Sequence, residues 1–151
     1  MIRDGAAGPV QDTQFRGIRS ARPTPEILAA VAAASVIVIG PSNPVISIGP
    51  ILAVPGVRDA MRTASATVVA VSPLVHGQVL KGPTDAFLAW AGHPLTSDGI
   101  VAHYDGLLDG LVADERADAL PTLVVDVEMA DAAGRRRLAR DVLGFAAALA
   151  G

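Results

Sequence analysis

The chain has 151 residues, enough for one domain with a sizeable core, and its formal net charge is −3 at pH 7. It is 51% hydrophobic, mostly through alanine and valine, but no apolar run approaches the ~20 residues of a membrane span. Cysteine is absent, which excludes disulfides, iron–sulfur clusters and thiol chemistry. The mildly acidic balance contains no basic block of the kind that binds duplex nucleic acid. We therefore expect a cytoplasmic protein that handles small molecules, with no nucleic-acid or membrane partner.

The first part of the chain carries few apolar positions. Residues 1–25 are predicted to be a linker, a loop or a short edge strand over residues 15–18. Thr24 can act as the N-cap of a helix over residues 25–34, in which proline is the first residue. Residues 36–39 follow as an uncharged run of β-branched side chains, which predicts a strand covered on both faces.

The same alternation of helix and strand continues to the end of the chain. It predicts a three-layer α/β domain with a mainly parallel sheet. In chain order, the remaining expected elements are a helix over 55–63, a strand over 67–71, helices over 83–91 and 96–108, strands over 111–113 and 123–127, and a closing helix over 134–149.

Polar or backbone-restricting residues follow three of the predicted strands. Residues 40–44 (GPSNP) come after the first strand, Ser72 and Pro73 after the second, and Asp126 and Glu128 close the last. In parallel α/β sheets, ligands bind outside the carboxyl ends of the strands. The sequence therefore predicts a ligand cleft at this edge of the sheet, with the GPSNP segment beside Ser72.

The stretch GPSNPVISIGP, residues 40–50, has the composition of a binding loop. Its first glycine lets the backbone approach a ligand, its prolines hold the loop rigid, and its serine and asparagine side chains suit phosphate oxygens, ribose or a base edge. Gly49 and Pro50 are expected to begin a helical turn whose free N–H groups face an anion. The alternative is a rigid turn in which serine and asparagine only cap backbone groups. The candidate binding residues are Gly40, Pro41, Ser42, Asn43, Pro44 and Ser47.

A second stretch, SPLVHGQVLKGPTD, spans residues 72–85. Lys81 is the only lysine beside eleven arginines, and it could supply a point charge for phosphate, although a solvated loop lysine is the simpler interpretation. His76 lies in the same loop and could be a surface residue or an acid–base group. His93 and His103 are expected to be structural or exposed, because the spacing of the three histidines matches no familiar metal pattern.

Charged residues gather around the last predicted helix. Arg135–Arg137 and Arg140 are expected to form a solvated helix face. Asp126, Glu128 and Asp131 could hold a magnesium ion or a hydroxyl group, or could cap the helix that follows them. The residues alone leave both alternatives open.

Together these blocks resemble the CofD family of 2-phospho-L-lactate transferases, whose actinobacterial members are phosphoenolpyruvate transferases. The resemblance covers residues 15–149 and rests on the order and spacing of GPSNPVISIGPILAVPG, a strand ending in SP, HGQVLKGPTD, VAHYDGLLDGLVAD, DVEMAD and RRRLARDVLGFA. These blocks match the carboxyl-terminal half of the family. The resemblance assigns residues 1–25 to a linker or edge segment and residues 26–151 to the carboxyl-terminal part of a Rossmann-like sandwich.

The resemblance implies a function in the assembly of coenzyme F-420. The family transfers a phospholactyl or phosphoenolpyruvyl group from a guanosine diphosphate conjugate to the deazaflavin Fo, with magnesium present and GMP released. It implies that residues 40–44 and Ser47 form a wall of the nucleotide and donor site, with Ser72, Pro73 and Lys81 beside it. It identifies no catalytic residue in this chain.

The chain also departs from the family pattern. The glycine-rich turn, the metal-binding aspartate and the Fo-holding residues of the family's amino-terminal half have no counterpart here, and the family's D-[TS]-L-M block appears as Asp126-Val127-Glu128-Met129. We therefore expect a chain that is inactive alone and forms a homo-oligomer or pairs with a partner carrying the amino-terminal half. The alternative function is a non-catalytic guanine-nucleotide-binding or assembly module.

Overall fold

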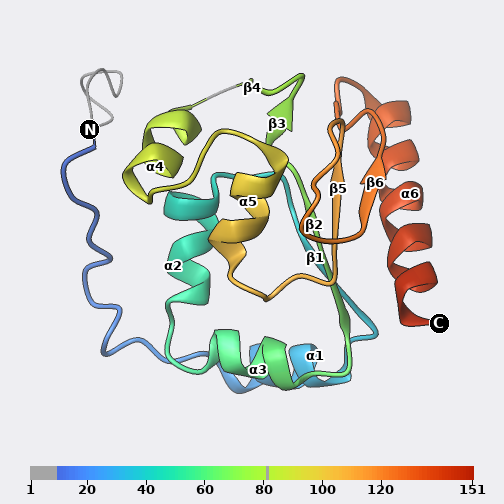
Figure 1. Ribbon diagram of the computed structural model, residues 1–151. Coiled ribbons are helices and arrows are strands. Elements are labelled where there is room, and N and C mark those ends of the chain that lie inside the picture. Colours follow the sequence, from blue (N-terminus) through green and yellow to red (C-terminus); the bar gives the residue numbers. More distant parts are fainter. Residues whose placement is uncertain (1–9, 81) are drawn as a thin grey trace.

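A parallel sheet of four strands forms the centre of the protein. The computed structural model describes residues 10–80 and 82–151 (Figure 1). The strands lie in the order β1-β2-β5-β6, and every neighbouring pair is parallel. Their bounds are β1 (Val36–Ile39), β2 (Thr67–Val71), β5 (Gly110–Ala113) and β6 (Thr122–Val124). The predicted α/β class with a mainly parallel sheet is confirmed.

Helices cover both faces of this sheet and give three layers (Figure 1). Helices α2 (Gly49–Leu52), α4 (Thr84–Trp90) and α5 (Ser97–Tyr104) lie on one face, and α6 (Ala132–Ala150) lies on the other. Helices α1 (Pro25–Ala33) and α3 (Val57–Thr63) pack against each other below the amino ends of the strands. None of the helices in the described part of the chain is long and apolar enough to cross a membrane.

Each face of the sheet has its own hydrophobic core. Phe87, Leu88 and Ile100 are at most 1% exposed and pack against the face that carries α4 and α5. On the opposite face, Leu138 and Val142 of α6 pack against β2 and β5. Because both faces of the sheet are buried, the sequences of the central strands are continuous apolar runs and do not alternate between apolar and polar residues.

The helix boundaries follow from capping residues. The Oγ1 atom of Thr24 accepts the N–H of Ile27 at 3.5 Å, as its predicted role as N-cap of α1 requires. Asp131 caps α6 by accepting the N–H of Gly134 at 2.7 Å. Helix α5 ends at Tyr104, short of the predicted residue 108, because Asp105 adopts a left-handed conformation with φ of 49°.

The structure overturns one sequence expectation and decides between alternatives at a second place. Strand β1 is not covered on both faces, because it ends the sheet and leaves Val38 45% exposed. Residues 16–20 form a turn, which agrees with the loop alternative and not with the edge strand considered for residues 15–18. Phe15, just before this turn, packs against Gly49, where an added Cβ atom would lie 3.3 Å from the Phe15 ring.

Candidate functional site

The predicted strand-end segments meet around one pocket of about 730 Å³ at the carboxyl edge of the sheet. The loop after β1, the residues after β2, the segment that leads into α4 and the loop after β6 all contribute to its walls. Its lining residues are Pro41, Ser42, Asn43, Ile46, Ser47, Ser72, Pro73, Val75, Leu80, Gly82, Pro83, Val127, Glu128, Met129 and Ala130. The arrangement matches the general rule that ligands of parallel α/β sheets bind at this edge.

The wall after β1 is a π-helical turn, η1 (Pro44–Ile48), that runs directly into α2. The side-chain oxygen of Asn43 accepts the N–H groups of Val45 at 2.9 Å and Ile46 at 3.0 Å, and its amide nitrogen donates to Thr84 Oγ1 at 3.3 Å. Asn43 therefore performs the capping role that was the alternative to ligand binding, while it also lines the pocket. π-Helical turns occur often at functional sites.

Helix α2 begins at Gly49, as the sequence predicts, but it continues the η1 turn without a break. The N–H of Gly49 donates to the carbonyl of Pro44, so this N–H group is not free to face an anion. The helical segment as a whole begins at Pro44, because Asn43 and Pro44 together form a cap.

The hydroxyl groups of the same wall are free within the described part of the chain. Ser42 and Ser47 are exposed, and neither side chain makes a hydrogen bond to a described residue. Ser72, at the end of β2, is different: it is 1% exposed and its Oγ accepts the N–H of Leu74 at 3.1 Å. Two serines of this site can therefore offer hydroxyl groups to a ligand, whereas Ser72 shapes the backbone behind them.

A two-stranded hairpin forms the rim above Ser72. It consists of β3 (Leu74–Val75) and β4 (Gln78–Val79), joined by a turn in which His76 has φ of 51°. The carboxylate of Asp114, the residue after β5, accepts the N–H of His76 and lies 3.6 Å from its Nδ1 atom. Asp114 is not among the residues predicted from the sequence, although its position directly after a central strand was a usable signal.

The wall after β6 is held by an arginine of α6. Arg137 Nη1 donates to the Asp126 carbonyl at 2.8 Å, and Nη2 lies 3.1 Å from the Asp126 carboxylate. Asp126 in turn accepts the N–H of Glu128 at 2.8 Å. Asp131 therefore caps α6, as one alternative predicted, whereas Asp126 caps no helix and bonds within the loop before it. Of the three acidic residues, only Glu128 lines the pocket.

A metal site does not emerge from the described residues. In the ranges 10–80 and 82–151, no group of three or more histidine, aspartate or glutamate side chains is close enough to hold an ion. Glu128 is the only charged side chain among the described residues that line the pocket. The other polar lining residues are neutral, and the lining also includes the apolar side chains of Ile46, Val75, Leu80 and Met129.

The histidines take structural or exposed positions. The rings of His93 and His103 pack edge to face with their centroids 5.3 Å apart. Burial lowers the pKa of His103 below its ordinary value of 6.5, and the nearby His93 and Arg58 lower it further, against the effect of a hydrogen bond to the Pro44 carbonyl. The side chain of His76 is 90% exposed. His103 belongs to α5, which packs against the η1 turn, and it lies outside the pocket lining.

Six of the nine predicted site residues line the pocket: Pro41, Ser42, Asn43, Ser47, Ser72 and Pro73. Gly40 and Pro44 flank the lining residues in the same loop, and Pro44 is buried. Lys81 lies outside the described residues. That these residues bind substrate stays a prediction.

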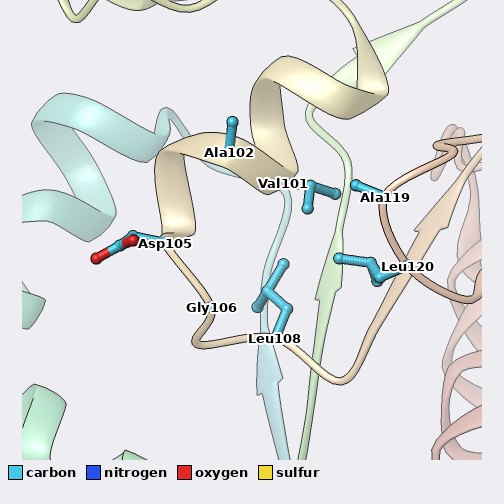
Figure 2. Close-up of a pocket in the computed structure, with 7 residues that line it drawn as sticks. All are labelled: Val101, Ala102, Asp105, Gly106, Leu108, Ala119 and Leu120. Atoms are coloured by element: carbon cyan, nitrogen blue, oxygen red, sulfur yellow. The ribbon is translucent and has the colours of Figure 1, made fainter.

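A second, smaller hollow of about 360 Å³ lies near the residues that enter β5 and β6, away from the carboxyl ends of the strands (Figure 2). It is formed by the last turn of α5, the loop that enters β5 and Ala119 with Leu120. The carboxylate of Asp105 points away from Leu108 and Leu120 in this view and lies 3.4 Å from Arg62 Nη2. The side chains that line the hollow are mostly small and apolar, so they offer few groups for binding a polar ligand or for catalysis.

The fold and the pocket define a Rossmann-like α/β protein with its candidate site at the carboxyl edge of a parallel sheet. Comparison with known families then shows that the chain belongs to the family described as 2-phospho-L-lactate transferase CofD, which matches residues 2–143. It is therefore a member of a transferase family.

Curated relatives carry the name phosphoenolpyruvate transferase. The Mycobacterium avium protein is 42% identical over 139 residues, which cover 83% of this chain and 41% of that protein. The Streptomyces griseus protein is 39% identical over 137 residues, covering 81% of this chain and 43% of its own length. The Streptomyces coelicolor protein is 37% identical over 155 residues, covering 96% and 49%. The chain thus spans less than half the length of each of these relatives.

Proposed function

We propose that this chain forms the nucleotide and donor part of a transferase that moves a phosphoenolpyruvyl or phospholactyl group from a guanosine diphosphate conjugate to the deazaflavin Fo. The product would be a precursor of coenzyme F-420, with GMP released. The observation that carries the proposal is the pocket itself, which brings the segments after β1, β2 and β6 together. Membership of the CofD family and relatives named phosphoenolpyruvate transferase support the reaction type.

The proposed reaction is a displacement at phosphorus. The Fo hydroxyl oxygen forms a bond to the phosphorus that carries the three-carbon unit, the bond from that phosphorus to the bridging oxygen breaks, and GMP leaves with the bridging oxygen and its electron pair. The hydroxyl proton goes to solvent, since no described residue is assigned as the base. Phosphoryl transfer depends mainly on positioning and charge stabilisation.

This chain's own residues would contribute to binding and positioning. The hydroxyls of Ser42 and Ser47 are free within the described residues to donate hydrogen bonds to phosphate or ribose oxygens. The apolar side chains of Val75, Leu80 and Met129, which also line the pocket, offer surface for a planar ring. Asn43 keeps the η1 turn in place through its two N–H contacts.

The family resemblance implies magnesium, and the described residues do not fit it by themselves. They contain no cluster of three possible ligands, and Glu128 is the single carboxylate among the described lining residues. Magnesium in phosphate sites is usually held by one or two carboxylates and the substrate phosphates. We propose that its protein ligands come from the part of the longer relatives that this chain does not align with.

Calorimetric titration of the chain with GDP tests the pocket. We expect binding that weakens about two- to tenfold in Ser42→Ala and in Ser47→Ala, because each loses one hydrogen bond. Ser35→Ala is the matched control, since Ser35 is an exposed serine that lies at the opposite end of the same strand. Absence of GDP binding, or an equal loss in Ser35→Ala, would contradict the proposal.

A turnover assay then separates the two candidate functions. We expect the purified chain to convert no Fo when donor and magnesium are present, and to gain activity when a chain equivalent to the remaining half of the relatives is added. A non-catalytic guanine-nucleotide-binding module would bind GDP and stay inactive with that partner. Conversion of Fo by the chain alone would contradict the expectation that it is only part of the active unit.

A further inference from the structure

Arg135 Nη1 donates to the carbonyl of Met129 at 3.5 Å, so two arginines of the last helix contact the loop that follows β6. Of the two, Arg137 makes more contacts with this loop. Its side chain is 37% exposed, and it reaches from α6 to the loop that follows β6. Its contacts are the carbonyl and carboxylate of Asp126, the carbonyl of Glu128 at 3.5 Å and the carboxylate of Asp141 at 3.6 Å. By contrast, Arg136 and Arg140 are exposed and make no ion pair with any described residue.

The loop that Arg137 contacts is a continuous wall of the pocket. Residues 127–130 all line it, and they include Glu128, its only charged described side chain. Val127 is 4% exposed and belongs to the hydrophobic cluster under α6, so the backbone on either side of it cannot shift freely. Arg137 itself is absent from the lining, so any effect it has on a ligand must pass through this loop.

The geometry of the contacts requires a guanidinium group. Arg137 Nη1 and Nη2 donate to two carbonyls and one carboxylate at the same time, and Asp126 also accepts the N–H of Glu128. A planar fork with several donors can satisfy acceptors in this arrangement, whereas a lysine ammonium is a single point charge on a flexible stem. Asp126 accepts hydrogen bonds from Arg137 and from the N–H of Glu128, and these bonds hold the backbone that carries Glu128 in one direction.

We propose that Arg137 is a positioning residue, which holds the Glu128 wall at the geometry that a ligand in the pocket requires. The proposal rests on the proposed function for the identity of the ligand, while the hold on the loop can be measured without any ligand. Loss of the guanidinium would release residues 125–130 and weaken binding through the displaced wall. Arg137 would have this effect without touching the ligand.

Two readouts on matched variants test this inference. Arg137→Met removes every hydrogen-bond donor of the side chain and keeps a side chain of similar length. Arg137→Lys keeps the positive charge. Arg140→Met is the control, because it removes the same charge three residues further along the helix. Hydrogen exchange of the amides of residues 125–130 is measured first, without ligand, and the dissociation constant for GDP is measured second. Exchange of the β2 amides reports whether the fold as a whole has changed.

We expect exchange of residues 125–130 to rise about tenfold in Arg137→Met, the order expected for lost hydrogen bonds to a charged donor, with β2 unchanged. GDP binding should weaken about fivefold or more in the same variant, by less in Arg137→Lys, and by less than about twofold in Arg140→Met.

Equal exchange in Arg137→Met and Arg140→Met would overturn the inference, and so would faster exchange with unchanged GDP affinity. If the unaltered chain binds no GDP, the proposed function fails, and the exchange comparison still decides whether Arg137 holds the wall.

Discussion

Strands β1 and β2 have similar sequences and lie side by side in the sheet, yet they are buried to very different extents. Both are short, uncharged and rich in β-branched residues, VIVI in β1 and TVVAV in β2. All five residues of β2 are buried, whereas Val38 of β1 is 45% exposed. Strand β2 has a neighbour on each side, while β1 ends the sheet. Helix α6 packs against both strands, but more extensively against β2. Substitutions in two strands of similar sequence should therefore change the free energy of unfolding by different amounts.

The largest expected effect is a charge placed in the central strand. Val69 is 0% exposed and pairs with Val38 in the sheet. We expect Val69→Asp to lower the free energy of unfolding by about 4 kcal/mol or more, because an unpaired carboxylate would be buried. Val38→Asp should cost about 1 kcal/mol, because its side chain stays in water. Urea unfolding followed by circular dichroism measures both, and equal losses would contradict the comparison.

A smaller effect is expected from added volume at the start of β5. A Cβ atom on Gly110 would lie 2.6 Å from Leu149 Cδ1 and 2.7 Å from Phe145 Cε1, both on α6. We expect Gly110→Ala to cost about 2 kcal/mol, because the side chains of Leu149 and Phe145 must move aside and repack. Gly40, at the end of β1, has no atom within 4 Å of such a Cβ, so Gly40→Ala is the control. A loss in Gly40→Ala that matches Gly110→Ala would argue against close packing as the cause.

The exposed edge of β1 predicts self-association. An unpaired strand edge with an apolar side chain invites pairing with another chain, and a lysine at such an edge prevents it. We expect dimers or larger assemblies at micromolar concentration, and we expect Val38→Lys to raise the dissociation constant about tenfold, or about 1.4 kcal/mol. Sedimentation velocity measures this. An unaltered chain that is monomeric at these concentrations would show that the β1 edge does not need a partner.

The serines that follow the two strands should also differ. Ser72→Ala after β2 leaves the buried N–H of Leu74 without its partner, and we expect a loss of about 1 kcal/mol. Ser42→Ala after β1 should change stability by less than about 0.5 kcal/mol, because its side chain is exposed and makes no hydrogen bond to a described residue. Thermal unfolding of both variants tests the difference, which would be refuted by a reversed order.

The smallest expected effect concerns His103, which lies on α5 beside the η1 turn, and the way in which the stability of the chain depends on pH. The pKa of His103 lies below 6.5 in the folded chain, chiefly through burial, so the unfolded chain binds more protons just below pH 6.5. Stability should therefore be complete above pH 6.5 and should decline as the pH falls below it. His103→Gln cannot titrate, so this part of the decline should disappear in unfolding measurements between pH 7 and pH 5. An unchanged pH profile in His103→Gln would exclude His103 as the cause.

The sequence predicted β1 and β2 at their observed bounds, 36–39 and 67–71. It also located the starts of α1 and α6 within two residues, and it marked the segments that meet at the carboxyl edge of the sheet. These features depend on contacts within a few residues, such as a capping side chain or an uncharged run of β-branched residues. The candidate loop after β1 was found for the same reason, because its prolines, serines and asparagine stand together.

Only the tertiary structure decided which strand is central and which polar residues form the site. It joined Arg137 to Asp126 across 11 positions and His76 to Asp114 across 38, and it assigned Asn43 to capping as well as to the pocket wall. It also showed that the strand with exposed Val38 ends the sheet. Burial and long-range hydrogen bonds depend on residues that are distant in the chain, so local sequence patterns do not determine them.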